Sequence, residues 1–277
     1  MIEATHIHSI AVRQGIESGI VEKDYVLSKV LMSLATVDAF RRTLIFKGGT
    51  ALKKCFYPQW RFSEDLDFTS RAAMDKTAIL SIFGSTIAVC VDLFGLPLRV
   101  IEYSQYPRKD GPLVSAQLKI GYDGPLRKSS GQKNNVRIDI AFDENILEIP
   151  QLRKVFNAYT DDVEAEVPVY SLEEIVAEKL RSILQRRKSR DYYDVWLLLT
   201  RHIEDFSHAR VRDILYTKCA HRGLPAPALE HFLDPKRTDA AKAYWERGLA
   251  HQMTDLPPFE AVVNDLQGLL RGVIATE

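Results

Sequence analysis

Apolar and polar residues alternate along the chain in two ways, and each way predicts a different kind of element. At 17–35 and 75–94, apolar residues recur at helical spacing, and Gly95 and Pro97 end the second helix. At 135–142 they alternate with a period of two, which predicts a strand with one apolar face. Further strands are predicted at 44–46, 65–68, 98–103, 114–122 and 167–170.

The C-terminal part of the chain has a helical pattern. Ser171 and Glu174 form a capping box that starts a helix. Glycine and proline separate further helices, predicted at 191–199, 207–221, 226–233, 239–249 and 259–273. A boundary near Val169 therefore divides an α/β (α+β) domain at 1–169, in which helices flank a mixed sheet, from a helical C-terminal domain at 170–277.

Composition indicates an ordinary globular protein: 46% of the 277 residues are hydrophobic and 27% are charged. Lysine and arginine total 37, as do aspartate and glutamate, so only local patches could attract a nucleic acid. Cys55, Cys90 and Cys219 are far apart, which favours free thiols in a reducing cytoplasm. Neither a signal peptide nor an apolar run of membrane-spanning length is expected, and hence no membrane partner.

The strongest candidate chemistry lies at 47–68, KGGTALKKCFYPQWRFSEDLDF. Gly48 and Gly49 follow an apolar run and allow the backbone to turn sharply and approach a ligand. Thr50 then opens a short helix at 51–56, whose first backbone N–H groups would suit a phosphate. A plain turn is the alternative interpretation of the glycine pair.

Asp65 and Asp67 stand on a predicted strand with one residue between them, so both carboxylates leave the same face. Such carboxylates repel each other unless a cation lies between them, and a divalent metal with oxygen ligands is the natural occupant. A strand end that faces water is the alternative. Asp139 lies within the alternating strand at 135–142 and needs a partner, because burying an unpaired carboxylate is costly.

A second charged cluster lies in the helical part of the chain. Asp191 and Asp194 are three residues apart and share a helix face. Lys179, on the preceding helix, could neutralise the phosphates of a nucleotide. Alternatively, it pairs with one of the two aspartates and ties two helices together.

Basic residues concentrate in two segments. The densest run contains Arg186, Arg187 and Lys188, which could dock RNA phosphates or form a solvated helix end. A predicted loop at 123–134 carries Arg127, Lys128 and Lys133, with the same two interpretations.

Two strings in this chain resemble a known family. KGGTAL…RFSEDLDF, and later EKLR-x(8)-RDYYDV, are similar to motifs of the AbiEii/AbiGii toxins of bacterial toxin–antitoxin systems and of the related MenT-type toxins. These toxins belong to the DNA polymerase β-type nucleotidyltransferase superfamily. The resemblance extends to about Leu199 and implies a nucleotidyltransferase-type sheet.

The resemblance also implies roles for individual residues. Asp65 and Asp67 would hold Mg²⁺, and Asp139 matches the superfamily's third metal-site carboxylate, whereas Asp143 at the strand exit reads as a turn residue. Asp191 would lie close by as a base. A nucleoside triphosphate would be bound by Lys47, Gly48, Gly49, Thr50, Ser63 and Lys179.

The implied protein is the toxin of a type IV-like system, which modifies the 3′ end of tRNA and is paired with a separate antitoxin. Arg186, Arg187 and Lys188 are then the candidate RNA contacts. Two alternatives remain open: a nucleotidyltransferase acting on a protein or a small molecule, and a non-catalytic nucleotide-binding or partner-binding module. The joint presence of the glycine pair, both strand aspartates, Lys179 and Asp191 argues against the second.

Overall fold

The computed structural model describes residues 1–107, 113–127 and 134–274. These residues form two compact units, of which the first comprises 1–144 and 150–170 and the second 145–149 and 171–277. Each unit is described by itself. Lys128 and Lys133, two of the basic residues in the 123–134 loop, lie outside the described residues.

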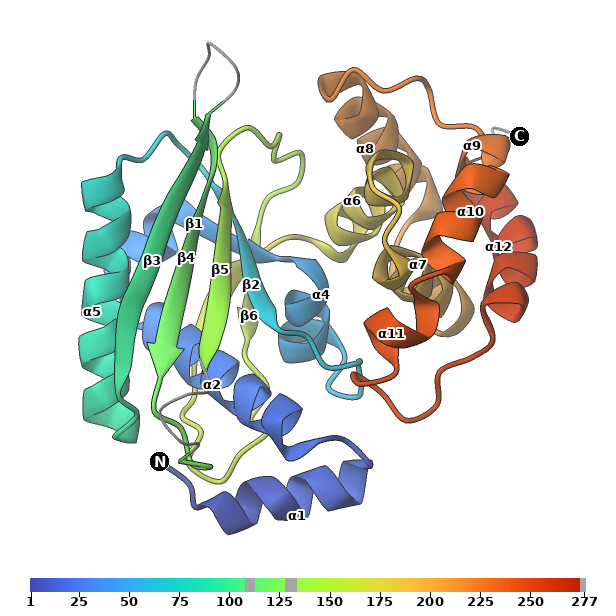
Figure 1. Ribbon diagram of the computed structural model, residues 1–277. Coiled ribbons are helices and arrows are strands. Elements are labelled where there is room, and N and C mark those ends of the chain that lie inside the picture. Colours follow the sequence, from blue (N-terminus) through green and yellow to red (C-terminus); the bar gives the residue numbers. More distant parts are fainter. Residues whose placement is uncertain (108–112, 128–133, 275–277) are drawn as a thin grey trace. The chain divides into compact units, whose positions relative to one another are not determined.

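The first unit is built on a mixed sheet whose seven described strands run in the order β3-β4-β5-β2-β1-β7-β6 (Figure 1). β1 is antiparallel to β2, whereas β2 is parallel to β5 and β1 is parallel to β7. The strands are β1 Leu44–Lys47, β2 Asp65–Ser70, β3 Leu98–Pro107, β4 Leu113–Tyr122, β5 Asn135–Ala141, β6 Gln151–Lys154 and β7 Glu166–Val169. This sheet confirms the predicted fold class.

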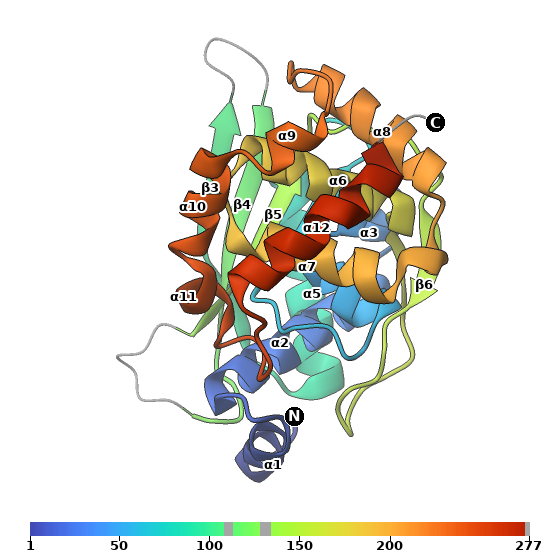
Figure 2. The ribbon, with the colours of Figure 1, turned by 90° about the vertical axis from the view of Figure 1, so that its right-hand side faces the viewer.

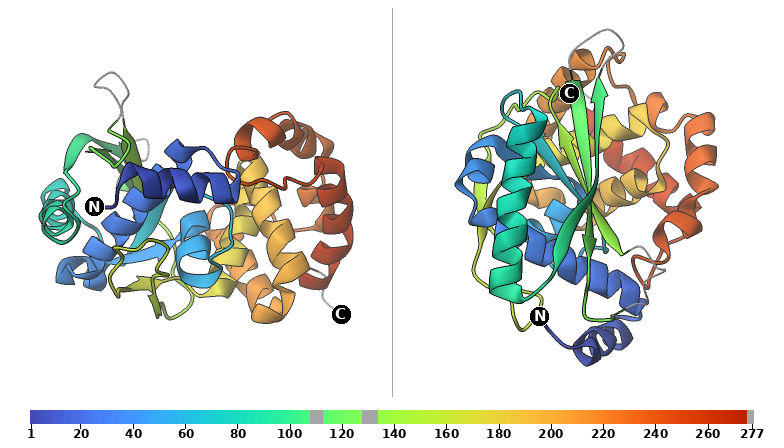
Figure 3. Two further views of the ribbon diagram at one scale, coloured as in Figure 1. Left: turned by 90° about the horizontal axis from the view of Figure 1, so that it is seen from below. Right: turned by 60° about the vertical axis from the view of Figure 1, so that its left-hand side comes forward.

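Helices flank the sheet: α1 Ala4–Gln14, α2 Ser18–Ala35, α3 Asp38–Thr43, α4 Gly48–Ala51, the π-helix η1 Leu52–Phe56 and α5 Lys76–Phe94. α2 and α5 contact each other, and α5 runs along the sheet in both Figure 1 and the right-hand view of Figure 3. One face of the central strands is apolar and fully buried, with Phe46, Leu66, Phe68, Ile138 and Ile140. The opposite face is therefore left for polar side chains.

Several elements differ from the prediction, and the helix expected at 239–249 is divided into α10 Pro235–Lys242 and α11 Trp245–Leu249. β6 lies in a segment for which no element was predicted, since this edge strand is short, polar and mostly exposed and so shows no alternating pattern. α4 begins at Gly48 itself, three residues earlier than expected, and continues into the π-helix η1. The glycine pair is thus the first part of a helical segment that follows β1 directly.

α5 is long and apolar enough to cross a membrane, so the prediction that no stretch reaches that length is wrong. Serine and threonine residues interrupt its apolar run, which made the helix look amphipathic in the sequence. About a third of the apolar window is buried in the structure, at Ile79, Ile82, Phe83 and Cys90 among others. One such helix among the described residues is weak evidence for a membrane span, because the core helix of a globular protein can have the same length and composition.

The second unit is helical (Figure 2). α6 contacts α7 and α8, and α12 packs on α7. Ser171 accepts a hydrogen bond from the Glu174 amide, which confirms the serine half of the predicted capping box, whereas the Glu174 carboxylate accepts from the amides of Leu147 and Glu148. The helices are α6 Leu172–Gln185, α7 Ser189–Arg201, α8 His208–His221, α9 Leu229–Phe232, α10 Pro235–Lys242, α11 Trp245–Leu249 and α12 Phe259–Ile274, with a 3-10 turn η2 Ile203–Asp205.

Candidate active site

Four charged residues of the first unit meet on the polar face of the sheet, and we call them the sheet site: Asp65, Asp67, Arg137 and Asp139. In the parallel pairing of β2 with β5, Asp65 lies opposite Arg137 and Asp67 lies opposite Asp139. Asp67 also lies opposite Lys47 of β1. Because side chains at the same register of neighbouring strands point to the same face, the four side chains project together.

Gly48 brings the start of α4 against the sheet site. Its φ of +81° is in the left-handed region that favours glycine. A Cβ atom at this position would lie 2.5 Å from Oδ2 of Asp67, closer than real Cβ contacts come. The glycine therefore allows the backbone to approach the carboxylate directly.

Arg137 links two of the three carboxylates. Its Nη2 donates to Oδ2 of Asp65 at 2.6 Å, and its Nε donates to Oδ2 of Asp139 at 2.9 Å. Burial lowers the pKa of Arg137, but the charges of Asp65 and Asp139 outweigh burial and raise it above the ordinary value. Gln117 of β4 donates to the other oxygen of Asp139 at 2.7 Å.

Two of the predicted phosphate-binding residues, Ser63 and Thr50, contact Asp65. Ser63 donates to Oδ1 of Asp65 at 3.3 Å, and the Thr50 hydroxyl donates to the Asp65 carbonyl at 2.5 Å. The ammonium of Lys47 lies 5.6 Å from the centre of the Tyr170 ring. Because the Thr50 hydroxyl is already bonded to β2, a ligand would have to be bound by its backbone N–H in the first turn of α4.

The carboxylates of the sheet site suit a divalent cation in kind, because hard cations prefer carboxylate oxygens. Among the described residues, no group of three or more histidine, cysteine, aspartate or glutamate side chains is already assembled closely enough to hold a metal ion. Arg137 explains this arrangement, since it separates Asp65 from Asp139 and neutralises both. The donor set therefore fits a metal, with the guanidinium as a competing cation.

The second unit contains another charged group, the helix-pair cluster: Lys179 of α6, Asp191 and Asp194 of α7, and Arg186 between the helices. Lys179 Nζ lies 2.7 Å from Asp194 Oδ2 and 3.4 Å from Asp191 Oδ1. Both carboxylates are fully buried. Burial raises the pKa of Asp191, but the charges of Lys179 and Arg186 outweigh burial and keep it below the ordinary value.

The basic run is divided by its contacts. Arg186 donates to both oxygens of Asp191, at 2.9 and 3.1 Å, in the forked geometry typical of arginine with a carboxylate. Arg187 and Lys188 are exposed and precede the first turn of α7. Arg186 thus belongs to the helix-pair cluster as well as to the predicted RNA-contact run.

Arg137 and Gln117 were not singled out from the sequence. Arg137 lies two residues before Asp139 on the same strand face, which is the one local signal of its pairing. Its contact with Asp65 spans 72 residues, and that of Gln117 with Asp139 spans 22, so neither follows from spacing along the chain. Asp143, the competitor of Asp139, stands in the bend after β5.

Comparison with protein families gives one match, which covers most of the chain. The family model described as "Nucleotidyl transferase AbiEii toxin, Type IV TA system" matches residues 29–265. Among proteins with curated descriptions, none is significantly similar to this chain.

Solved structures with the same fold include two nucleotidyltransferases. MenT4, a nucleotidyltransferase toxin from Mycobacterium tuberculosis H37Rv, superposes with a TM-score of 0.68 at 18% identity, over 100% of this chain and 91% of MenT4. A putative nucleotidyltransferase from H. pylori has a TM-score of 0.57 at 15% identity, over 93% of this chain and 96% of the other. At these identities the likeness concerns the fold.

Proposed function

The chain belongs to the AbiEii nucleotidyltransferase toxin family, and from that premise we propose that it transfers a nucleotide from a nucleoside triphosphate to an RNA, specifically to the 3′ end of a tRNA. In this proposal it acts in the cytoplasm as the toxin of a type IV system with a separate antitoxin. The observation that carries the proposal is the strand register that brings Asp65, Asp67 and Asp139 to one sheet face beside the Gly48 turn.

The residues of the sheet site would hold the triphosphate and the metal. Asp65, Asp67 and Asp139 would bind Mg²⁺, which would supply positive charge to the triphosphate. Gly48 lets the α4 backbone come close to this point, and the first amides of a helical segment, which lack intrahelical partners, are suited to phosphate oxygens. Ser63 and Lys47 flank the same carboxylates and would complete the phosphate contacts.

Lys179 and Asp191 would serve the transfer itself. The acceptor hydroxyl attacks the α-phosphorus, a new phosphorus–oxygen bond forms, and pyrophosphate leaves. An ammonium has three N–H donors. The two carboxylates of α7 orient the ammonium group of Lys179, and we expect its remaining N–H to donate to a phosphate oxygen. Asp191 would accept the proton of the attacking hydroxyl; the charges of Lys179 and Arg186 keep its pKa below the ordinary value, so it stays charged but is a weak base.

The test is to incubate the protein with total tRNA and each of the four α-labelled nucleoside triphosphates, with and without Mg²⁺. We expect label in the tRNA band with at least one nucleotide, dependent on the metal. Removal of the tRNA 3′ end by periodate oxidation and β-elimination should abolish it until the end is repaired. Label on a protein or a small molecule would replace RNA by that acceptor class, and the absence of any transfer would contradict an enzymatic role.

A further inference from the structure

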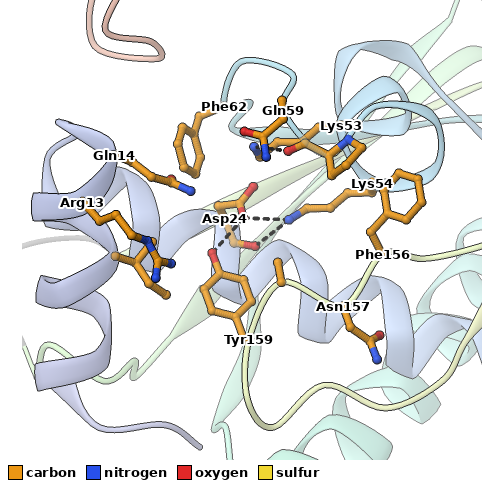
Figure 4. A pocket seen from close by; sticks show the side chains of 13 residues that line it. Arg13, Gln14, Asp24, Lys53, Lys54, Gln59, Phe62, Phe156, Asn157 and Tyr159 are labelled. Carbon is orange, nitrogen blue, oxygen red and sulfur yellow. Dashed lines mark hydrogen bonds and ion pairs between the residues drawn. The ribbon is translucent and has the colours of Figure 1, made fainter.

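A cavity of about 200 Å³ lies in the first unit, and its residues are separate from those of the sheet site. It is formed where α1, α2, η1, the loop before β2 and the segment after β6 meet (Figure 4). A single water needs only on the order of 15 Å³ by the same measure, so the space suits a planar ring better than an isolated water. Its buried walls carry charge, which a packing defect between apolar elements would not.

Asp24 and Lys54 form the floor of this cavity. Lys54 Nζ donates to Oδ2 of Asp24 at 2.7 Å and to the Ser28 hydroxyl at 2.8 Å, and the Tyr159 hydroxyl donates to the same Asp24 oxygen at 2.7 Å. Figure 4 shows Lys54 and Tyr159 both directed at Asp24. An ion pair that merely joins α2 to η1 would account for these contacts.

The second oxygen of Asp24 is what the ion pair leaves unexplained. Oδ1 is buried and has no hydrogen-bond partner among the described residues, which is costly for a carboxylate oxygen. A ligand that donates a hydrogen bond would remove this cost. Because Lys54 and Lys53 already place positive charge here, a neutral N–H group is favoured over a third ammonium.

Positive charge and aromatic rings surround the floor. Lys53 Nζ lies 4.2 Å from the centre of the Phe62 ring and donates to the Trp60 carbonyl at 2.9 Å. Burial lowers the pKa of Lys53 to about 8, so a nearby anion would stabilise its charged form. Arg13 lies exposed at the rim, and Phe156 lines the opposite side of the cavity from Phe62 (Figure 4).

We propose that this cavity binds a nucleotide: a flat base lies against Phe62 and Phe156, an amino group of the base donates to Asp24 Oδ1, and the phosphate lies toward Arg13 and Lys53. Aromatic side chains and polar edge contacts are the usual means of holding an unpaired base. The ligand can come from a free mononucleotide or from one nucleotide of an RNA strand. The proposal needs no catalysis, so it stands apart from the transfer reaction.

Isothermal titration with AMP in EDTA tests the proposal on the full chain. We expect saturable binding. Arg13→Gln should weaken AMP about tenfold and leave adenosine unaffected, because only the phosphate contact is lost. The matched control is Arg42→Gln, which changes an arginine whose side chain is 71% exposed and which does not line the cavity. Phe156→Leu should weaken AMP and adenosine alike, by about tenfold.

Three further ligands test the contacts to the base, to its amino group and to a longer strand. Ribose 5-phosphate should bind at least tenfold more weakly than AMP, because it has no base. Purine riboside 5′-monophosphate, which lacks the amino group, should also bind more weakly, which tests Asp24 Oδ1 without altering the protein. An oligoadenylate trinucleotide that binds more tightly than AMP, with the same sensitivity to Arg13→Gln, identifies an RNA strand as the source. Equal or weaker binding identifies the free nucleotide.

The proposal is overturned if the wild-type protein binds neither AMP nor the trinucleotide. It is equally overturned if Arg13→Gln and Phe156→Leu both bind AMP as the wild type does, since the binding would then lie elsewhere. Ribose 5-phosphate that binds as well as AMP would reduce the site to one for simple anions.

Discussion

The sheet site and the helix-pair cluster both combine carboxylates with basic side chains, but they differ in how solvent reaches them. In the sheet site, the side chains of Arg137 and Asp139 are 42% and 34% exposed, so their partners can be exchanged for a ligand. In the helix-pair cluster, Asp191 and Asp194 are fully buried and fixed by their cations. The difference favours ligand binding at the first group and, at the second, carboxylates that position Lys179, where Arg186 at 48% exposure is the part that solvent reaches.

The largest effect is expected from Asp67→Asn, which keeps the shape of the side chain but removes its charge. Nucleotide transfer should fall by about 10³-fold or more, because the proposed metal loses a charged ligand. The thermal midpoint should stay close to that of the wild type. Asp143→Asn, which makes the same change in the bend after β5, is the matched control and should remain active. A fully active Asp67→Asn protein would contradict the proposed role of the sheet site.

Lys179→Met should act first on stability. It leaves two buried carboxylates with less compensation, and we expect the free energy of unfolding in urea to fall by roughly 3–5 kcal/mol. Adding Asp194→Asn removes one of those charges and should restore part of that loss. If the lysine contacts phosphate, neither the single nor the double variant should arrest growth when it is expressed. Restored arrest in the double variant would assign Lys179 a structural role alone.

Arg137→Gln tests whether the guanidinium competes with a metal for Asp65 and Asp139. Without that competition, the affinity for Mn²⁺, measured by electron paramagnetic resonance, should rise by about tenfold. Lys119→Gln is the matched control: Lys119 lies opposite Arg137 in the pairing of β4 with β5, and it pairs with Glu102 instead. Weaker Mn²⁺ binding by Arg137→Gln would show that the arginine supports the site rather than blocks it.

The smallest effect concerns the exposed basic residues before α7. Changing Arg187 and Lys188 to alanine should lower the slope of log affinity for tRNA against log salt by about two units, one for each lost phosphate contact. Arg186 is left intact, because its removal would also disturb Asp191. Arg41 and Arg42 changed together to alanine provide the control for general charge. Equal slopes in all three proteins would exclude this run as the RNA dock.

Local patterns were sufficient for the elements on which the site is built. Alternation at 135–142 predicted β5 and the polar face that carries Asp139, and the pair Asp65 and Asp67 predicted two carboxylates on one face. These features depend on neighbours within a few residues, which the sequence displays directly. The fold class followed from the same patterns and from the family resemblance.

Pairings across the chain could not be predicted in the same way. Arg137 meets Asp65 only because β5 lies parallel to β2, and Tyr159 reaches Asp24 across 135 residues. Lys54, one of two adjacent lysines, is buried against α2 through a contact that its sequence neighbours do not indicate. Such contacts are set by the packing of whole elements, so they appear once the sheet order is known.

Gly48 is also a position at which a single mutation would abolish toxicity while the protein stays folded. Any missense change there both introduces a side chain against Asp67 and forces it into a backbone conformation that L residues rarely adopt. The damage falls at one end of a strand, where the rest of the core is unaffected. In a culture selected for survivors of its expression, we therefore expect codon 48 to recur among clones that still make full-length protein.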